Sequence, residues 1–204
     1  MSLAPKPRLG ILLSGRGSNF EAIARNVLSG RLNCEIGFVF SNKPQAPGLA
    51  LARELGLPAG CLESAGRDRA QFDAQVVDLL KSHGVDLVCL AGYMRLLSGG
   101  FVSQFPHRIL NIHPSLLPAF PGLDAQHQAL AYGVRVTGCT VHFVDENLDS
   151  GPILLQAPVA VLATDTVETL STRILLEEHR IYSEAIAWVT RGNYRIQGRT
   201  VIAT

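Results

Sequence analysis

Residues 9–40 read LGILLSGRGSNFEAIARNVLSGRLNCEIGFVF, and this stretch decides the fold class. A short apolar run, Leu9 to Leu13, leads through a glycine-rich turn into a helix expected over Ser18–Leu28. A second apolar run follows at Cys34–Phe40. Strand-like runs that alternate with helical patterns are typical of parallel α/β units. The stretch therefore predicts an α/β protein with an open, mostly parallel twisted sheet.

The same alternation continues to the middle of the chain. The expected elements are a short helix, a weak strand, a longer helix and a strand, over Leu49–Leu55, Ala59–Leu62, Asp68–Lys81 and Val85–Ala91. The last run is nearly all apolar, as in a strand that is covered on both faces. These elements extend the parallel part of the sheet.

The second half of the chain has a different pattern. The expected elements are a strand, a helix after a turn-rich loop, two β runs and a long closing helix, over Arg108–His113, Ala125–Ala131, Val134–Val144, Ile153–Val161 and Thr166–Trp188. The Asp145–Gly151 turn suggests that the β runs form a hairpin, and Thr164 or Asp165 is expected to cap the last helix. We predict one domain over residues 1–204, parallel first and mixed in its C-terminal part.

Composition narrows the class of protein. Of 204 residues, 47% are hydrophobic and 17% charged, and the formal net charge is +1. Such a chain can bury a core, and it has no general attraction for nucleic acid or an anionic membrane. No run approaches the ~18 apolar residues of a membrane-spanning helix, and Leu9–Leu13 is too short for a secretory signal. We expect a cytoplasmic protein that acts on small molecules.

Metal and disulfide chemistry are not expected. The cysteines form no Cys-x-x-Cys pair and lie in or beside apolar runs, so we predict reduced core residues at Cys34, Cys61, Cys89 and Cys139. No cluster has zinc-ligand spacing. Two histidines are expected to be solvated, His83 and His107, and His142 is interpreted as a satisfied, partly buried group within a strand.

The first candidate site is Ser14-Gly-Arg-Gly-Ser-Asn19, which joins a strand to a helix. Glycines let a backbone approach a bound group, and a helix start offers free N–H groups to a phosphate. The glycine spacing matches neither a dinucleotide-binding fingerprint nor a Walker loop. A tight turn with Ser18 or Asn19 as helix cap is an equally open interpretation.

The second candidate site combines a strand and a turn. Asn111 and His113 are two residues apart on a strand, so their side chains share one face, and both can donate to an oxyanion. Asp149 follows in the hairpin turn, where a carboxylate beside His113 would favour the cationic imidazole. A hydrogen-bonded core pair and ordinary turn chemistry are the structural alternatives. The trio suits acyl or formyl transfer without a covalent intermediate, because no Ser or Cys nucleophile is evident.

Several motifs occur together and in order along the chain. They are Leu13-Ser-Gly-Arg-Gly-Ser-Asn19, Phe40-Ser-Asn-Lys43, Leu90-Ala-Gly-Tyr-Met-Arg-Leu-Leu-Ser98, Ile109-Leu-Asn-Ile-His-Pro-Ser-Leu-Leu-Pro118, Thr137-Gly-Cys-Thr-Val-His-Phe-Val-Asp145 and Leu148-Asp-Ser-Gly-Pro152. In this set, the chain resembles the folate-dependent phosphoribosylglycinamide formyltransferase family from Leu9 to about Ile186. The resemblance implies a Rossmann-like formyltransferase fold, with a nucleotide phosphate-binding half at about 8–105 and a folate-binding and catalytic half at about 106–190.

The resemblance also implies site residues. Asn111, His113 and Asp149 match the catalytic trio of the family. The substrate-binding positions are Gly17, Ser18 and Asn19 for the phosphate and Glu178 for the ribose. The positions that match the formylfolate site are Arg69, Met94, Arg95, Leu96, Leu97 and Asn111, and the Asp145–Asp149 turn resembles a second wall of that site.

The implied activity is transfer of a formyl group from 10-formyltetrahydrofolate to the glycyl amine of 5-phosphoribosylglycinamide, in de novo purine (IMP) biosynthesis. No metal is implied, and the protein would be a monomer or homodimer. The chain departs from the family at Asp124 and Gln126, where histidines are common, and at Leu175, which is commonly polar. A formyltetrahydrofolate hydrolase and a non-catalytic nucleotide-binding module are the alternatives.

Overall fold

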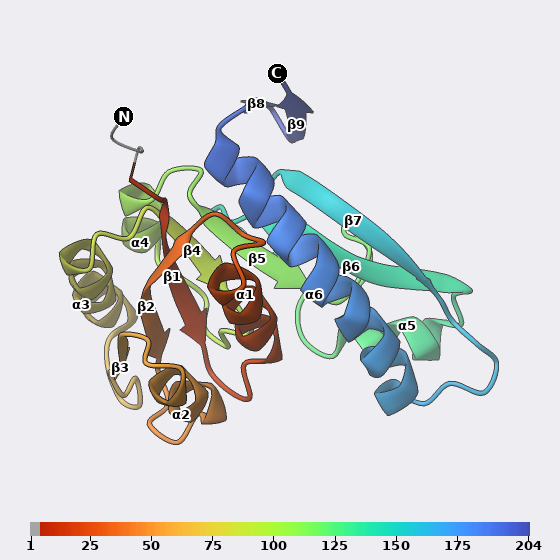
Figure 1. The fold of residues 1–204 in the computed structure, drawn as a ribbon. Coiled ribbons are helices and arrows are strands. Elements are labelled where there is room, and N and C mark those ends of the chain that lie inside the picture. The colour runs from red at the N-terminus through yellow and green to blue at the C-terminus, as the bar shows by residue number, and fades with distance from the viewer. Residues whose placement is uncertain (1–4) are drawn as a thin grey trace. The chain divides into compact units, whose positions relative to one another are not determined.

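The strands expected within residues 9–40 are present in the computed structural model, which describes residues 5–204 (Figure 1). Strand β1 (Arg8–Leu13) pairs in parallel with β2 (Glu35–Ser41). Between them lies α1 (Ser18–Leu28), with the expected bounds. The chain divides into two units, one that ends at Leu110 and one that spans Asn111–Thr204. The organisation of the chain as one domain stays a prediction.

All strands in the sheet of the first unit are parallel to one another. Its strand order is β3-β2-β1-β4, with β3 at Ala59–Cys61 and β4 at Leu87–Leu90. Three further helices belong to this unit: α2 (Pro47–Glu54), α3 (Arg69–Ser82) and α4 (Gly99–Gln104). Every residue of β4 is buried, which is the arrangement that its apolar sequence predicts.

The second unit has a mixed sheet in the order β5-β6-β7-β9-β8. Its strands are β5 (Ile109–His113), which begins at the end of the first unit, β6 (Val136–Phe143), β7 (Ile153–Ala160), β8 (Tyr194–Gln197) and β9 (Thr200–Ala203). Strands β6 and β7 are antiparallel, so the predicted hairpin is confirmed. The α/β class, with a parallel first part and a mixed second part, is confirmed as well.

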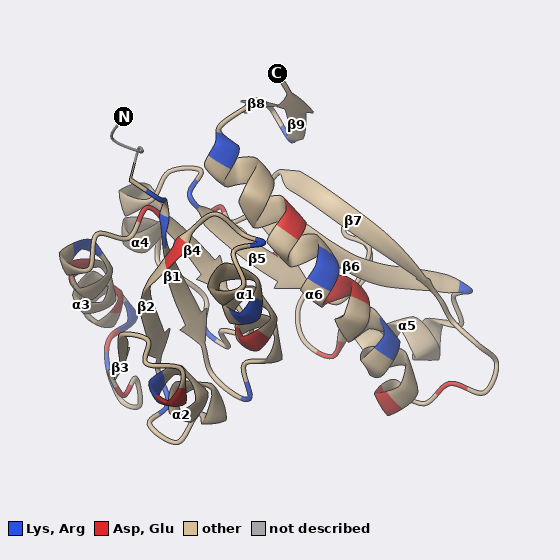
Figure 2. Ribbon diagram, in the orientation of Figure 1, with Lys and Arg blue, Asp and Glu red and all other residues tan. Residues whose placement is uncertain are grey.

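Two helices complete the second unit, α5 (Ala125–Tyr132) and α6 (Val167–Arg191). Helix α6 packs on β6 and β7 through a buried apolar stripe that includes Ile174 and Ile181. Its other side carries charged residues along its length (Figure 2). Among them, Arg180 pairs with Glu177 and Glu184, three and four residues away, as is typical of a solvated helix face.

Three details differ from the sequence prediction. Helix α4 was not expected, because it starts with two glycines, which have low helix propensity. Ser98 caps this helix, and its hydroxyl accepts from the Phe101 N–H group. The β8–β9 hairpin was not expected either. The cap of α6 is Thr166, which exchanges hydrogen bonds with Thr169, and Asp165 instead forms an ion pair with Arg173.

The expectation of four core cysteines is wrong for Cys61. Cys34, Cys89 and Cys139 are buried, but Cys61 is exposed because it ends β3, the edge strand of the first unit. The expectation of a solvated His83 is also wrong, since its ring is half-buried, stacks on Phe38 at a centroid distance of 4.1 Å and bonds the Leu79 carbonyl. No helix between residues 5 and 204 is long and apolar enough to cross a membrane.

Candidate functional site

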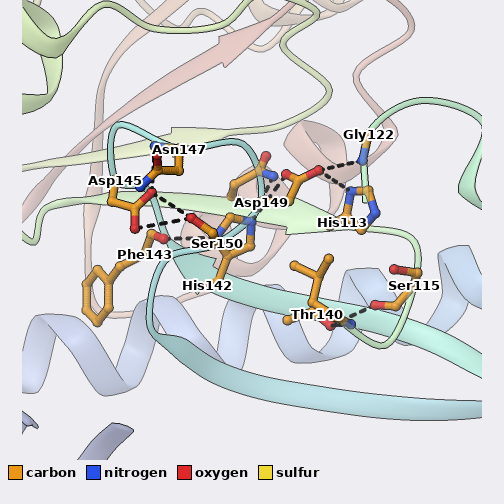
Figure 3. A network of polar contacts seen from close by, with 12 residues as sticks. His113, Ser115, Gly122, Thr140, His142, Phe143, Asp145, Asn147, Asp149 and Ser150 are labelled. Atoms are coloured by element: carbon orange, nitrogen blue, oxygen red, sulfur yellow. Dashed lines mark hydrogen bonds and ion pairs between the residues drawn. The ribbon is translucent and has the colours of Figure 1, made fainter. Parts of the chain in front are cut away.

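Strand β5 carries the polar pair of the second candidate site. His113 is buried, and its Nδ1 atom lies 3.4 Å from Oδ2 of Asp149 (Figure 3). Its Nε2 atom lies 2.8 Å from the carbonyl oxygen of Phe120. Because a carbonyl oxygen only accepts, Nε2 carries a proton. A further proton on Nδ1 would make the ring a cation that faces the carboxylate.

The hairpin turn places the Asp149 carboxylate, whose side chain is 9% exposed. Its Oδ2 atom accepts from the Gly122 N–H group at 2.8 Å. Asp149 has a positive φ of 48°. Two residues later, a Cβ atom at Gly151 would lie 1.9 Å from the Phe143 carbonyl oxygen, so only glycine fits. The turn thus has a fixed shape that brings Asp149 to His113, as the sequence analysis anticipated.

His142 of β6 also belongs to this cluster. Its interpretation as a satisfied, buried group within a strand is confirmed, but its contact with Asn111 was not expected. It is 2% exposed, its Nδ1 lies 2.8 Å from the Phe143 carbonyl oxygen, and its Nε2 lies 3.1 Å from Nδ2 of Asn111. Burial lowers the pKa of His142, an effect that the Phe143 bond and the Asp149 charge only partly oppose. A neutral ring must carry its proton on Nδ1, so Nε2 accepts from the Asn111 amide. The pairing of β6 beside β5 is the signal that could have identified it.

The loop that supplies the Phe120 carbonyl is itself held by β6. The buried Thr140 hydroxyl donates to the Ser115 carbonyl at 2.7 Å and accepts from the Leu117 N–H group at 3.0 Å. Gln156 of β7 donates to the Leu117 carbonyl and to the same hydroxyl. The Ser115 hydroxyl in turn donates to the Ala119 carbonyl at 2.5 Å, next to the Phe120 carbonyl at 3.3 Å. Backbone groups near His113 are therefore fixed by side chains of the hairpin strands.

The glycine-rich loop lies in the first unit. Gly17 is the N-cap of α1 in the left-handed conformation, with a φ of 76°, and as a glycine it has no side chain that could cap the helix. The alternative interpretation, with Ser18 or Asn19 as the helix cap, is therefore wrong. Ser18 begins the helix, and Asn19 is buried within its first turn. A helix start without a side-chain cap keeps N–H groups available for an anion.

Apart from Asn111 in β5, the residues that match the formylfolate site follow β4 or begin α3. Met94 and Leu96, two residues apart, are 62% and 56% exposed. The Arg95 guanidinium lies 4.6 Å from the Phe72 ring centroid, Leu97 is half-buried, and Arg69 is exposed at the start of α3.

Glu178 lies on the buried side of α6 and is 7% exposed, so it is not on a solvated helix face. Burial raises the pKa of Cys139 in β6 to about 12, and the negative charge of Glu178 adds to this rise. Among residues 5–204, no group of three or more His, Cys, Asp and Glu side chains is placed to hold a metal ion.

The chain matches a known protein family over most of its length. A family model described as formyl transferase matches residues 8–186. The phosphoribosylglycinamide formyltransferase of Escherichia coli (strain K12) is 41% identical over 187 residues, which cover 91% of this chain and 88% of that protein.

The chain is also similar to part of a longer protein and to solved structures. The trifunctional purine biosynthetic protein adenosine-3 of Homo sapiens is 44% identical over 192 residues, 94% of this chain, but the chain spans only 19% of its length. The crystal structure of glycinamide ribonucleotide transformylase 1 from Symbiobacterium toebii superposes with a TM-score of 0.95 at 53% identity, and covers 97% of this chain and 94% of that chain.

Proposed function

The chain belongs to the formyl transferase family, in the group of phosphoribosylglycinamide formyltransferases, and on this premise we propose its reaction. It transfers the formyl group of 10-formyltetrahydrofolate to the glycyl amine of 5-phosphoribosylglycinamide, a step of de novo purine (IMP) biosynthesis. The observation that carries the proposal is the buried cluster in which Asp149 contacts His113 while His142 holds Asn111.

The proposed chemistry is direct attack. The amine lone pair forms a bond to the formyl carbon, and the carbonyl π electrons move to the oxygen. Asn111 and His113 donate N–H hydrogen bonds to that oxyanion. When the carbonyl re-forms, the bond to N10 of the folate breaks, and N10 takes up a proton as the amine loses one. Asp149 orients His113 and helps to move the amine proton through water.

The Phe120 carbonyl sets a condition on this mechanism. It accepts the Nε2 proton of His113, so that proton reaches a substrate oxygen only if the substrate replaces the carbonyl as acceptor. Asn111 needs no such exchange, because an amide nitrogen has two hydrogens and His142 accepts one of them.

The remaining assignments belong to the same proposal. Gly17, Ser18 and Asn19 bind the phosphate of the ribonucleotide, and Glu178 binds its ribose. Arg69, Met94–Leu97 and Asn111 bind the folate, for which the exposed Met94 and Leu96 side chains are a suitable surface. We further propose that the protein acts in the cytoplasm, as a monomer or homodimer, without a metal or a nucleic acid partner.

The test is formyl transfer by the purified protein. Tetrahydrofolate release from 10-formyltetrahydrofolate is followed with and without the ribonucleotide, and we expect release only when both are present. Release without the ribonucleotide would assign a hydrolase instead. Binding of both ligands without release would assign a non-catalytic binding module.

Variants of the cluster test the residue roles. His113→Ala and Asn111→Ala should each lower kcat by about 10²–10³, as loss of an oxyanion donor does elsewhere. Asp149→Asn should lower kcat as well. His127→Ala, on the exposed side of α5, is the matched histidine control and should keep wild-type activity. Near-wild-type activity in His113→Ala or Asp149→Asn would remove these residues from the mechanism.

A further inference from the structure

The segment Met94–Ser98, proposed to line the folate site, is held at its first residue by Ser14. The Ser14 hydroxyl is buried and accepts from the Met94 N–H group at 2.8 Å. It donates to Oδ1 of Asn42 at 2.6 Å, and Asn42 in turn donates to the Ser64 hydroxyl at 3.2 Å. Ser14 directly follows β1 and opens the glycine-rich loop, and Asn42 directly follows β2. One hydroxyl therefore fixes Met94 relative to the ends of two neighbouring strands.

The last residue of the segment is held by a second buried side chain, Asp73 of α3. Asp73 is 1% exposed, and its Oδ2 atom accepts from the Ser98 N–H group at 2.6 Å. A hydrogen bond to a carboxylate is stronger than one between neutral groups, and burial strengthens it further. The proposed mechanism uses neither Asp73 nor Ser14.

Two neighbouring contacts place Asp73 in the same small cluster as the segment. The residue before it, Phe72, lies under the Arg95 guanidinium, 4.6 Å from its ring centroid to the guanidinium carbon. Burial raises the pKa of Tyr93, the residue that precedes the segment, and the negative charge of Asp73 adds to that rise.

Between the hydrogen bonds to Ser14 and Asp73, the segment exposes apolar side chains to solvent. Met94 and Leu96 are more than half exposed, although their backbone is attached at both ends to buried groups. Exposed apolar side chains on a fixed backbone form a surface that a ligand can cover without first ordering a loop, and this lowers the entropic cost of binding.

We infer that Asp73 and Ser14 are positioning residues that hold segment Met94–Ser98 in the conformation that receives the formylfolate. This inference rests on the proposed function, since that function assigns the segment to the folate. Asp73 acts on the folate alone. Ser14 also fixes the start of the glycine-rich loop, so its loss affects the binding of both substrates.

The test separates the Michaelis constants of the two substrates. In Asp73→Ala, the KM for 10-formyltetrahydrofolate should rise by about tenfold, the range that loss of a hydrogen bond to a charged group gives. The KM for the ribonucleotide and kcat should change little. Asp73→Asn keeps an acceptor oxygen and should restore most of the affinity for the folate. Ser14→Ala should raise both KM values.

Two control variants on α3 distinguish positioning from stability. Asp78→Asn alters an exposed carboxylate on the same helix and should match the wild type. Val76→Ala removes buried volume from this helix and should lower the unfolding temperature without raising the KM for the folate. An unchanged folate KM in both Asp73→Ala and Ser14→Ala, or an equal rise in Val76→Ala, would overturn the inference.

Calorimetric titration with tetrahydrofolate keeps this result separate from that of the proposed function. If the wild type binds tetrahydrofolate but transfers no formyl group, the proposed function fails. Weaker tetrahydrofolate binding by Asp73→Ala or Ser14→Ala would still support the positioning role. If the wild type transfers the formyl group and both Asp73→Ala and Ser14→Ala bind tetrahydrofolate with wild-type affinity, the positioning role fails alone.

Discussion

At the residue scale, His142 determines how Asn111 is oriented. Its Nδ1–H group donates to the Phe143 carbonyl. The Nε2 lone pair therefore accepts a hydrogen bond from the amide nitrogen of Asn111. That bond distinguishes the nitrogen of the Asn111 amide from its oxygen. The Oδ1 atom of Asp149 is 3.7 Å from the same Nε2, beyond hydrogen-bond range. The arrangement is that of a neutral imidazole.

The lowered pKa of His142 predicts a pH-dependent stability. Its ordinary pKa is 6.5, so in acid the unfolded chain binds a proton that the folded chain excludes. The free energy of unfolding should therefore fall as the pH drops below 6.5, by at most about 1.4 kcal/mol per pH unit from this residue. Urea unfolding of the wild type and His142→Gln at several pH values measures the difference. Parallel pH profiles for the two proteins would contradict a neutral, buried His142.

Gly17 predicts a specific effect on the binding of the ribonucleotide. Its φ of 76° is strained for other residues, and an added Cβ would lie 3.2 Å from Gly48 and from Leu13. Gly17→Ala should therefore cost more than the about 1 kcal/mol of left-handed strain alone and should raise the KM for the ribonucleotide. Gly30→Ala is the matched control, because Gly30 has a φ of 75° and an added Cβ would meet nothing within 4 Å. An equal KM in the two variants would remove Gly17 from the phosphate site.

At the scale of the element, β6 contains two buried threonines with opposite expected effects. Thr140 has three hydrogen-bond partners, whereas the Thr137 hydroxyl has no partner among residues 5–204. Thr140→Val should lower the free energy of unfolding by about 1–3 kcal/mol, because it leaves buried backbone groups unpaired. Thr137→Val should be neutral or stabilising. Denaturant unfolding of both variants is the measurement, and equal losses would contradict the assigned hydrogen bonds.

Elements with a strong periodic pattern could be predicted from the sequence, and the others could not. Helix α1 and the β6–β7 hairpin follow from apolar spacing and turn composition. Helix α4 is short and starts with two glycines, so its stability comes from a Ser98 cap and the buried Phe101, which propensity does not reveal. The cap of α6 depends on a reciprocal Thr166–Thr169 exchange, and several nearby residues have suitable chemistry for that position.

At the scale of the whole molecule, the thiols predict a chemical titration. Three of the four cysteines are buried and Cys61 is exposed. Burial raises the pKa of Cys139 to about 12, so it forms almost no thiolate near neutral pH. One thiol per chain should react quickly with a disulfide reagent in native protein, and all four in denaturant. Partial desolvation of the thiol and the negative charge of Glu63 raise the pKa of Cys61, so this reaction should accelerate as the pH increases. Fast reaction of more than one native thiol would contradict the burial of the other three.

The candidate site could be predicted only as a set of residue types. Asn111, His113 and Asp149 were identifiable because two lie on one strand face and the third lies in a hairpin turn. The sequence could not reveal that the partner of Asn111 is His142, since that contact depends on which strands are neighbours. The sequence also could not reveal that the Phe120 carbonyl accepts from His113, because every residue has a backbone carbonyl, whatever its side chain.

That carbonyl has a consequence for the resting enzyme. Under the proposed mechanism, the Phe120 carbonyl oxygen occupies the role of the substrate oxygen before a ligand binds. Its hydrogen bond to Nε2 keeps the His113 ring in a fixed orientation. Exchanging one oxygen acceptor for another requires little rotation of the ring. A competitive inhibitor of this enzyme should therefore offer its own oxygen at the position of this carbonyl, in place of a group that must turn the histidine.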